Sequence, residues 1–364
     1  MKKIAICTTL LLSVFSLASC ANNSEQKEET RIVKDMLNRE VEIVNEPSKF
    51  VCIGPGCLRQ YCYVADVTKL VGIENCEQTD SSLDVKPYLN KIPNYKELPI
   101  IGEGGSKDKT NDEQILKVNP DIIFTSYVSD PNAIELLQKR TGIPVVAVGY
   151  NSNGLFAEDI YNSLKLIGDI TNNVSRAEAV VNYFENSKNE LSTIANKNPS
   201  KERAYVGAVN HRGSFGIEST TGDFPIFDVL KIKNIVHEEN ITNFAKIDKE
   251  ALLRLQPDKI IIDAGGLSKL QEDMKVHPSY YAEFNAFKNK EVYVELPFVF
   301  YSNNFDVALA NAYFVGSVFY PNEFKNFDIK TKFNEIEDFL LGVDVYDKIT
   351  THYHCDYGKL NYTL

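Results

Sequence analysis

The sequence predicts an α/β protein made of two sandwich lobes, each with a mainly parallel central sheet, joined by a long helix. A gapless internal repeat is the first observation, because residues 113–121 (EQILKVNPD) match residues 250–258 (EALLRLQPD). An apolar run typical of a buried parallel strand follows each copy. The stretch 157–198 has apolar residues at helical spacing and no proline, which predicts the connecting helix. We therefore expect two lobes of similar build.

The N-terminus has the pattern of an export signal. Residues 1–19 begin with two lysines before a long apolar run, as signal peptides do. The sequence LASC at 17–20 then resembles the bacterial lipobox, so Cys20 is expected to become the first mature residue and to carry lipid. Residues 20–30 are polar and predict a flexible tether. An ordinary secretory signal followed by a chance cysteine is the alternative.

The repeat and the helical stretch divide the rest of the chain. The expected parts are an N-terminal lobe (31–155), a linker helix (156–199), a C-terminal lobe (200–345) and a C-terminal extension (346–364). Asp112 and Asp248 are expected to cap the two repeat helices, and a proline ends each one. The linker helix is expected to break at 168–175, with Ser175 as the cap of its second half. The predicted strands, bounded by Gly, Pro or polar residues, are 50–53, 70–73, 122–125, 145–148, 204–209, 259–263 and 291–296.

Charge and motifs exclude several classes of protein. The chain has 50 acids and 39 bases, a formal charge of −11 and no basic stripe, so nucleic acid is not an expected partner. It has no P-loop, no G-x-S-x-G and no H-E-x-x-H motif, so we do not expect an enzyme. An enzyme with an unmarked site and a purely adhesive lipoprotein remain remote alternatives, but the adhesive protein would not need a two-lobe repeat.

The cysteines beyond the lipobox do not form a metal or disulfide motif. They are Cys52, Cys57, Cys62, Cys76 and Cys355. Their number is odd and their spacing fits neither C-x-x-C nor a zinc knuckle, so small buried hydrophobes are expected. A disulfide among the first four is the alternative. His352, His354 and Cys355 could together hold a soft metal, but a tail without metal is favoured.

Several segments resemble, in order and spacing, a known family. They are 35–43 (DMLNREVEI), 50–56 (FVCIGPG), 70–73 (LVGI), 118–123 (VNPDII), 141–146 (TGIPVV), 292–297 (VYVELP) and 319–324 (FYPNEF). On these segments, residues 31–345 resemble the solute-binding lipoproteins of ABC importers for iron complexes, haem and cobalamin. GPGCLR at 54–59, HRG at 211–213 and PFVFYSN at 297–303 resemble the subgroup labelled as predicted metal-compound receptors.

The resemblance implies a rigid helical linker, a ligand clamped in the cleft between the lobes and only modest closure. It also implies an extracytoplasmic protein, anchored to the bacterial membrane, that works with an ABC permease and its ATPase; we expect a monomer. Glu113 and Glu250 occupy equivalent places in the repeat and are implied to dock on the permease. Ordinary acids at helix starts are the alternative for this pair. No permanently bound cofactor is expected, because the ligand is cargo.

Loops at the carboxyl ends of the parallel strands are the expected ligand contacts. Those contacts are Pro55, Gly56, Cys57, Arg59, Tyr127, Tyr150, His211, Arg212 and Tyr301. The Gly-Pro-Gly turn offers a helix start to an anion. Arg59, facing His211 and Arg212 on the other lobe, could clamp an anion or a carboxylate- or catecholate-bearing chelate from both sides. The tyrosines would form walls or donate hydroxyls, and a surface salt bridge is the alternative for Arg59.

An iron chelate, such as a siderophore, or haem is the leading expectation for the cargo. The tyrosines, with Phe224, Phe298 and Phe300, favour a large ligand in an open aromatic cleft. The runner-up is a molybdate or tungstate oxyanion, which would need a small closed site of N–H donors. A bare Zn or Mn ion is disfavoured, because the plausible ligands near the cleft are few. Those ligands are Glu103, Asp130, His211 and Asp263.

Overall fold

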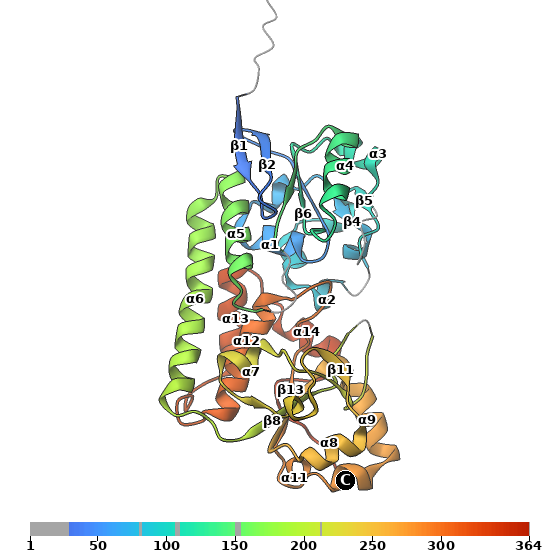
Figure 1. Cartoon of the computed structure of the whole chain (residues 1–364), viewed down its shortest axis with the longest axis vertical. Helices are drawn as coiled ribbons and strands as arrows, with labels where there is room; N and C mark the ends of the chain where they lie inside the picture. Colours follow the sequence, from blue (N-terminus) through green and yellow to red (C-terminus); the bar gives the residue numbers. More distant parts are fainter. Residues whose placement is uncertain (1–28, 80–81, 106–109, 150–153, 212, 364) are drawn as a thin grey trace, which may run out of the picture.

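The computed structural model describes residues 29–79, 82–105, 110–149, 154–211 and 213–363. Two lobes lie end to end, the N-terminal lobe in blue to green and the C-terminal lobe in yellow to red, and helix α6 runs beside both (Figure 1). Within those ranges, no helix combines the length and apolar character that crossing a bilayer requires. The architecture is the two-lobe α/β fold that the sequence predicts.

The N-terminal lobe is built on a parallel three-stranded sheet, β3-β6-β7. Its strands are β1 (Thr30–Lys34), β2 (Glu40–Val44), β3 (Phe50–Ile53), β4 (Ile73–Glu74), β5 (Ile100–Gly102), β6 (Ile122–Thr125) and β7 (Val145–Ala147). Its helices are α1 (Cys57–Val64), α2 (Ser82–Val85), α3 (Asp112–Val118) and α4 (Pro131–Thr141). Short 3-10 turns lie at η1 (Val67–Lys69), η2 (Asn75–Glu77), η3 (Pro87–Lys91) and η4 (Tyr95–Glu97). Strands β3, β6 and β7 are buried along their whole length, as continuous apolar runs in a parallel sheet should be.

The C-terminal lobe has a five-stranded sheet in the order β10-β8-β12-β13-β14. Its strands are β8 (Arg203–Gly207), β9 (Ser219–Thr221), β10 (Lys233–Asn234), β11 (Phe244–Lys246), β12 (Lys259–Asp263), β13 (Val292–Glu295) and β14 (Gly358–Lys359). Its helices are α7 (Pro225–Val229), α8 (Lys249–Leu255), α9 (Leu267–Val276), α10 (Pro278–Ala282), α11 (Asn285–Lys288), α12 (Phe305–Phe319), α13 (Ile329–Leu340) and α14 (Tyr346–Tyr353), with 3-10 turns η5 (Ile235–Glu239) and η6 (Ala264–Gly266). Strands β8, β12 and β13 pair in parallel, so their carboxyl ends meet at one edge.

The linker is two helices rather than one. Helix α5 (Glu158–Ile170) ends at a short break and α6 (Val174–Lys197) continues along the lobes. The break falls where the sequence predicts it, but the second helix starts one residue before Ser175, after Asn172 adopts a left-handed φ of 58°. Arg176 in the first turn of α6 donates to the carbonyl oxygens of Tyr63, Phe339 and Leu340, so α6 is tied to elements of both lobes.

The internal repeat has the same local structure in both lobes. Asp248 caps α8 as expected, accepting from the backbone N–H groups of Glu250 and Ala251. In the first copy Asn111 is the cap instead of Asp112, which is already helical and pairs with Arg140 on α4 at 2.5 Å. Each helix then ends in a left-handed residue directly before the repeat proline.

Residues 346–364, expected as an extension, are part of the C-terminal lobe as far as residue 363. Strand β14 pairs antiparallel with β13 and completes the edge of the sheet. Tyr346 and Tyr357 are buried, and the Tyr357 hydroxyl donates to Asn311 Oδ1 at 2.5 Å. The segment lies outside the repeat, so its role in the core could not be read from the repeat pattern.

Candidate functional site

A cleft of about 870 Å³ opens between the lobes, where the carboxyl ends of the strands face one another. Pro55, Ser126 and Tyr127 line it from the N-terminal lobe. Its C-terminal side is formed by loops and strand ends, together with aromatic rings from three segments. Those rings are Phe224, Phe244 and Phe298.

Four of the expected ligand contacts line this cleft. They are Pro55, Tyr127, His211 and Tyr301. The His211 ring stacks on Phe244 with the ring centroids 4.3 Å apart, so it presents a flat aromatic surface. Tyr150 and Arg212 lie outside the described residues, and their predicted contacts stay predictions.

The start of α1 is covered by the opposite lobe. A Cβ on Gly56, which has φ 76°, would lie 3.0 Å from Ser302, so the loop that contains Ser302 closes over this turn. Cys57 is fully buried. Gly54 is also required, because at φ 92° a Cβ there would come within 2.6 Å of Ser126 Oγ. In this arrangement Ser302 of the opposite lobe lies against the turn where the anion is expected.

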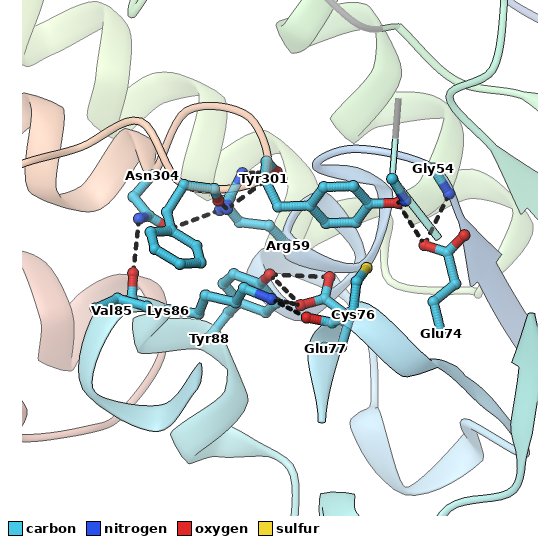
Figure 2. Close-up of polar contacts among 12 residues, drawn as sticks. Gly54, Arg59, Glu74, Cys76, Glu77, Val85, Lys86, Tyr88, Tyr301 and Asn304 are labelled. Atoms are coloured by element: carbon cyan, nitrogen blue, oxygen red, sulfur yellow. Dashed lines mark hydrogen bonds and ion pairs between the residues drawn. The ribbon is translucent and has the colours of Figure 1, made fainter. Parts of the chain in front are cut away.

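Arg59 does not line the cleft; its side chain joins the lobes. The residue is 0% exposed. Its Nε donates to Asn304 Oδ1 at 2.8 Å and its Nη2 donates to the Phe300 carbonyl at 2.8 Å (Figure 2). The guanidinium also lies 4.7 Å from the centroid of the Tyr88 ring. The protein itself therefore occupies the donors of Arg59, the first arginine of the expected clamp. Because Arg59 is buried, it does not form the surface salt bridge that was the alternative.

Tyr301 crosses to the N-terminal lobe and meets a buried carboxylate. Its hydroxyl donates to Glu74 Oε2 at 2.9 Å, and the same oxygen accepts from the N–H of Gly54 at 3.0 Å (Figure 2). Tyr127 reaches Glu74 Oε1 at 3.3 Å. Burial raises the pKa of Glu74 to about 7, although these hydrogen bonds act in the opposite direction.

A buried ion pair lies beside this cluster. Lys86 Nζ lies 2.7 Å from Glu77 Oε2 and donates to the carbonyl of Cys76 at 2.7 Å (Figure 2). The Tyr88 hydroxyl donates to the same Glu77 carboxylate. Sequence analysis missed these groups, because the only signal was a scatter of charged residues in loops. Such residues are usually solvated, and their burial depends on the other lobe.

The C-terminal floor of the cleft holds two more carboxylates, Asp263 and Glu295, at the ends of β12 and β13. Burial raises the pKa of Asp263 to about 6. Burial and the neighbouring Asp263 both raise the pKa of Glu295. Sequence analysis considered Asp263 but missed Glu295. The same rule, a charged residue at the carboxyl end of a buried strand, would have found it.

The expected docking residues are exposed. Glu113 lies in the first turn of α3 and Glu250 in the first turn of α8. These are equivalent positions in the repeat, one on each lobe, but nothing in the structure tests docking.

Metal-binding side chains are dispersed in the part of the chain that is described. Within it, no three His, Cys, Asp or Glu side chains converge as they would around a metal ion. In the tail, His352 Nδ1 lies 3.3 Å from Asp84 Oδ2 instead. Cys52, Cys57, Cys62, Cys76 and Cys355 are free thiols.

Comparison with known proteins identifies the family of this fold. A family model described as periplasmic binding protein matches residues 57–296. The chain belongs to the periplasmic binding protein family. This confirms the resemblance seen in the sequence, and members of the family bind solutes and are not enzymes.

Relatives of this binding protein are distant but cover most of its length. YvrC of Bacillus subtilis, an uncharacterized ABC transporter substrate-binding lipoprotein, is 25% identical over 308 residues, which are 80% of this chain and 89% of YvrC. A periplasmic solute binding protein of Veillonella parvula has a TM-score of 0.69 at 18% identity, covering 89% of this chain and 96% of that one. MolA of Haemophilus influenzae, bound to molybdate, has a TM-score of 0.65 at 16% identity, covering 86% and 98%. The two structural likenesses show the fold alone.

Proposed function

We propose that this periplasmic binding protein is the lipid-anchored receptor of an ABC importer and that it captures iron in an organic chelate or in haem. The cleft is the observation that carries the proposal. Its volume of about 870 Å³ falls within the range of about 300–1,000 Å³ that is typical of pockets for drug-sized ligands. The aromatic rings of Phe224, Phe244 and Phe298 supply flat apolar surfaces for the organic part of such a complex.

A molybdate or tungstate oxyanion is the second candidate, and the molybdate-bound MolA is the observation that favours it. Such a small anion needs several N–H donors within about 3 Å. The described lining residues include no lysine or arginine, whereas three of them are carboxylic acids. The size and the charge of the cleft therefore support the larger complex.

The anchor and the partner belong to the same proposal. The described chain begins just before β1, and Cys20, the proposed lipid attachment, lies outside the described residues. YvrC, which is called a lipoprotein and an ABC transporter component, supports an extracytoplasmic position on the membrane and delivery to a permease with its ATPase. Glu113 and Glu250 are the proposed contacts with that permease.

A thermal-unfolding panel tests the cargo. The protein, purified from membranes in mild detergent, is heated with ferric hydroxamate and catecholate chelates, haem, cyanocobalamin, molybdate, tungstate, Mn²⁺ or Zn²⁺. A ligand present at about one hundred times its dissociation constant adds about 2.7 kcal/mol, which raises the midpoint by several degrees. We expect the increase with an iron chelate or haem. An increase with molybdate or tungstate alone would replace the proposal with the second candidate.

A further inference from the structure

Two acids lie side by side on the floor of the cleft. Asp263 ends β12 and Glu295 ends β13, and the two residues are partners in the parallel register of these strands. Paired residues of neighbouring strands present their side chains on the same face of a sheet. Asp263 is 5% exposed and Glu295 is 1% exposed, and both line the cleft. The carboxyl groups therefore form one buried acidic position at the strand ends.

The two acids differ in their hydrogen bonds. Asp263 Oδ1 accepts from the N–H of Gly265 at 2.7 Å and Oδ2 accepts from the N–H of Asn210 at 3.2 Å. Glu295 Oε2 is buried and has no hydrogen-bond partner. A buried polar atom without a partner is costly, so native proteins rarely keep one unless it has a use. Glu295 thus keeps an acceptor without a partner just beneath the surface of the cleft.

The surrounding charge does not compensate this pair. The described residues that line the cleft include no lysine or arginine, and a third acid, Asp223, is among them. Asp223 is already occupied, since its Oδ1 accepts from Thr221 Oγ1 at 2.5 Å. Burial, and after it the closeness of Asp263, raise the pKa of Glu295, as expected when no described cation offsets them. The described residues therefore offer Glu295 Oε2 neither a hydrogen-bond donor nor a positive charge.

We propose that Asp263 and Glu295 form a subsite for a donor group on the cargo, an ammonium or an amide N–H at the rim of a metal chelate. This inference rests on the proposed function. It narrows the ligand class to chelates that are neutral or positively charged where they face Asp263 and Glu295. The aromatic rings of Phe224 and Phe298 would contact the organic body of the chelate. The donor would then reach Glu295 at the floor.

A matched pair of probes tests the subsite on the unmodified protein. Ferrioxamine B is a ferric hydroxamate with one free ammonium arm, and acetylation of that amine removes the charge and leaves the rest of the chelate unchanged. We expect ferrioxamine B to bind at least about tenfold more tightly than its acetylated form, because a charged hydrogen bond is lost. Cyanocobalamin, with amide N–H groups on its rim, is the second donor-bearing probe.

Glu295→Gln keeps the shape of the side chain. It should reduce the preference for ferrioxamine B over its acetylated form to less than about threefold. If cyanocobalamin is the ligand bound, the same variant should bind it more weakly. Glu291→Gln is the matched control, because Glu291 directly precedes the same strand, at the end away from Glu295, and pairs with Lys259 outside the cleft. It should keep the wild-type preference. The thermal midpoint of each variant reports whether it is folded.

Each other outcome is decisive. Equal binding of the two ferrioxamines by the wild type, or a preference that survives Glu295→Gln, would overturn the subsite alone. Binding of an anionic ferric catecholate or of haem that is tighter than binding of ferrioxamine B, and that Arg212→Ala abolishes, would also overturn the subsite. This result would support the predicted cationic clamp instead. The proposed function would stay intact. Failure to bind any chelate, haem or corrinoid would overturn the proposed function, and the subsite with it.

Discussion

The two lobes place buried carboxylates around the cleft in different ways. On the N-terminal side, Glu74 and Glu77 are surrounded by donors, and one of those donors, the Tyr301 hydroxyl, comes from the opposite lobe. On the C-terminal side, Glu295 has an oxygen without a partner. Glu74 and Glu77 stabilise the structure through their hydrogen bonds, whereas Glu295 is available to a donor group of the proposed ligand. Burial alone therefore does not separate structural acids from binding acids; Glu295 differs from Glu74 and Glu77 in combining an unpartnered oxygen with a place in the lining of the cleft.

The largest expected effect is the loss of the buried ion pair. Lys86→Met leaves the Glu77 carboxylate buried with the Tyr88 hydroxyl, which should lower the free energy of unfolding by about 3–5 kcal/mol. Urea unfolding measures the change. Lys330→Met, which breaks an exposed pair with Asp347, is the control and should leave the free energy of unfolding nearly unchanged. A similar small cost for Lys86→Met would mean that the pair is not structural.

The next effect is a pH dependence that arises from Glu74. Its pKa of about 7 in the folded state exceeds the value of about 4.3 expected in the unfolded chain. The stability contributed by its proton is therefore fully present below about pH 4.3 and is lost as the pH rises through 7, a change of about 3 kcal/mol. Glu74→Gln should remove this loss, measured by urea unfolding from pH 4 to pH 8.

The exposed Glu40 on β2 provides the control for this experiment. Glu40→Gln should leave the wild-type pH profile in place. Parallel profiles for the wild type and Glu74→Gln would show that Glu74 ionises as readily in the folded protein as in the unfolded chain.

A smaller effect is expected where the lobes meet at Arg59. Arg59→Lys keeps the charge but loses the planar fork that reaches both Asn304 and the Phe300 carbonyl, and should cost about 1.5–3 kcal/mol of stability. Ligand affinity should change by less than about threefold, because the guanidinium does not line the cleft. Titration of the same variant with its ligand checks this. Unchanged stability with a large loss of affinity would instead restore Arg59 as a ligand contact.

The smallest effect on stability is expected at the proposed docking residues. Glu113→Ala and Glu250→Ala change exposed side chains and should alter the free energy of unfolding by less than about 0.5 kcal/mol. Ligand affinity should stay the same, while uptake by cells that carry the cognate permease should fall severalfold. Glu135→Ala on the exposed face of α4 is the control. Full uptake by the double variant would remove these residues from the docking surface.

The fold could be predicted because its signals are local. Strands 50–53, 122–125 and 259–263 have the predicted bounds, since a continuous apolar run between turn residues is enough to specify a buried parallel strand. The strand ends also located the cleft, which Tyr127, His211 and Tyr301 line. Their contact with a ligand stays a prediction.

The role of Arg59 could not be predicted in the same way. Its partners, Phe300 and Asn304, lie more than 240 residues away in the sequence, on a loop of the other lobe. That loop places Tyr301 and Ser302 at positive φ, a conformation that non-glycine residues rarely adopt and that no local pattern announced. Arginine near a cleft was a reasonable ligand candidate, but only the folded loop shows which groups occupy its donors.

The position of β14 has a consequence for how the chain matures. Synthesis proceeds from the N-terminus, so the β3-β6-β7 sheet has all its strands once residue 147 is made, whereas the sheet of the C-terminal lobe waits for residues 358–359. Until β14 pairs, the side of β13 that faces away from β12 is an open edge, and such edges promote pairing between chains. A C-terminal lobe in which β14 has not yet paired therefore keeps an open edge at which chains can aggregate.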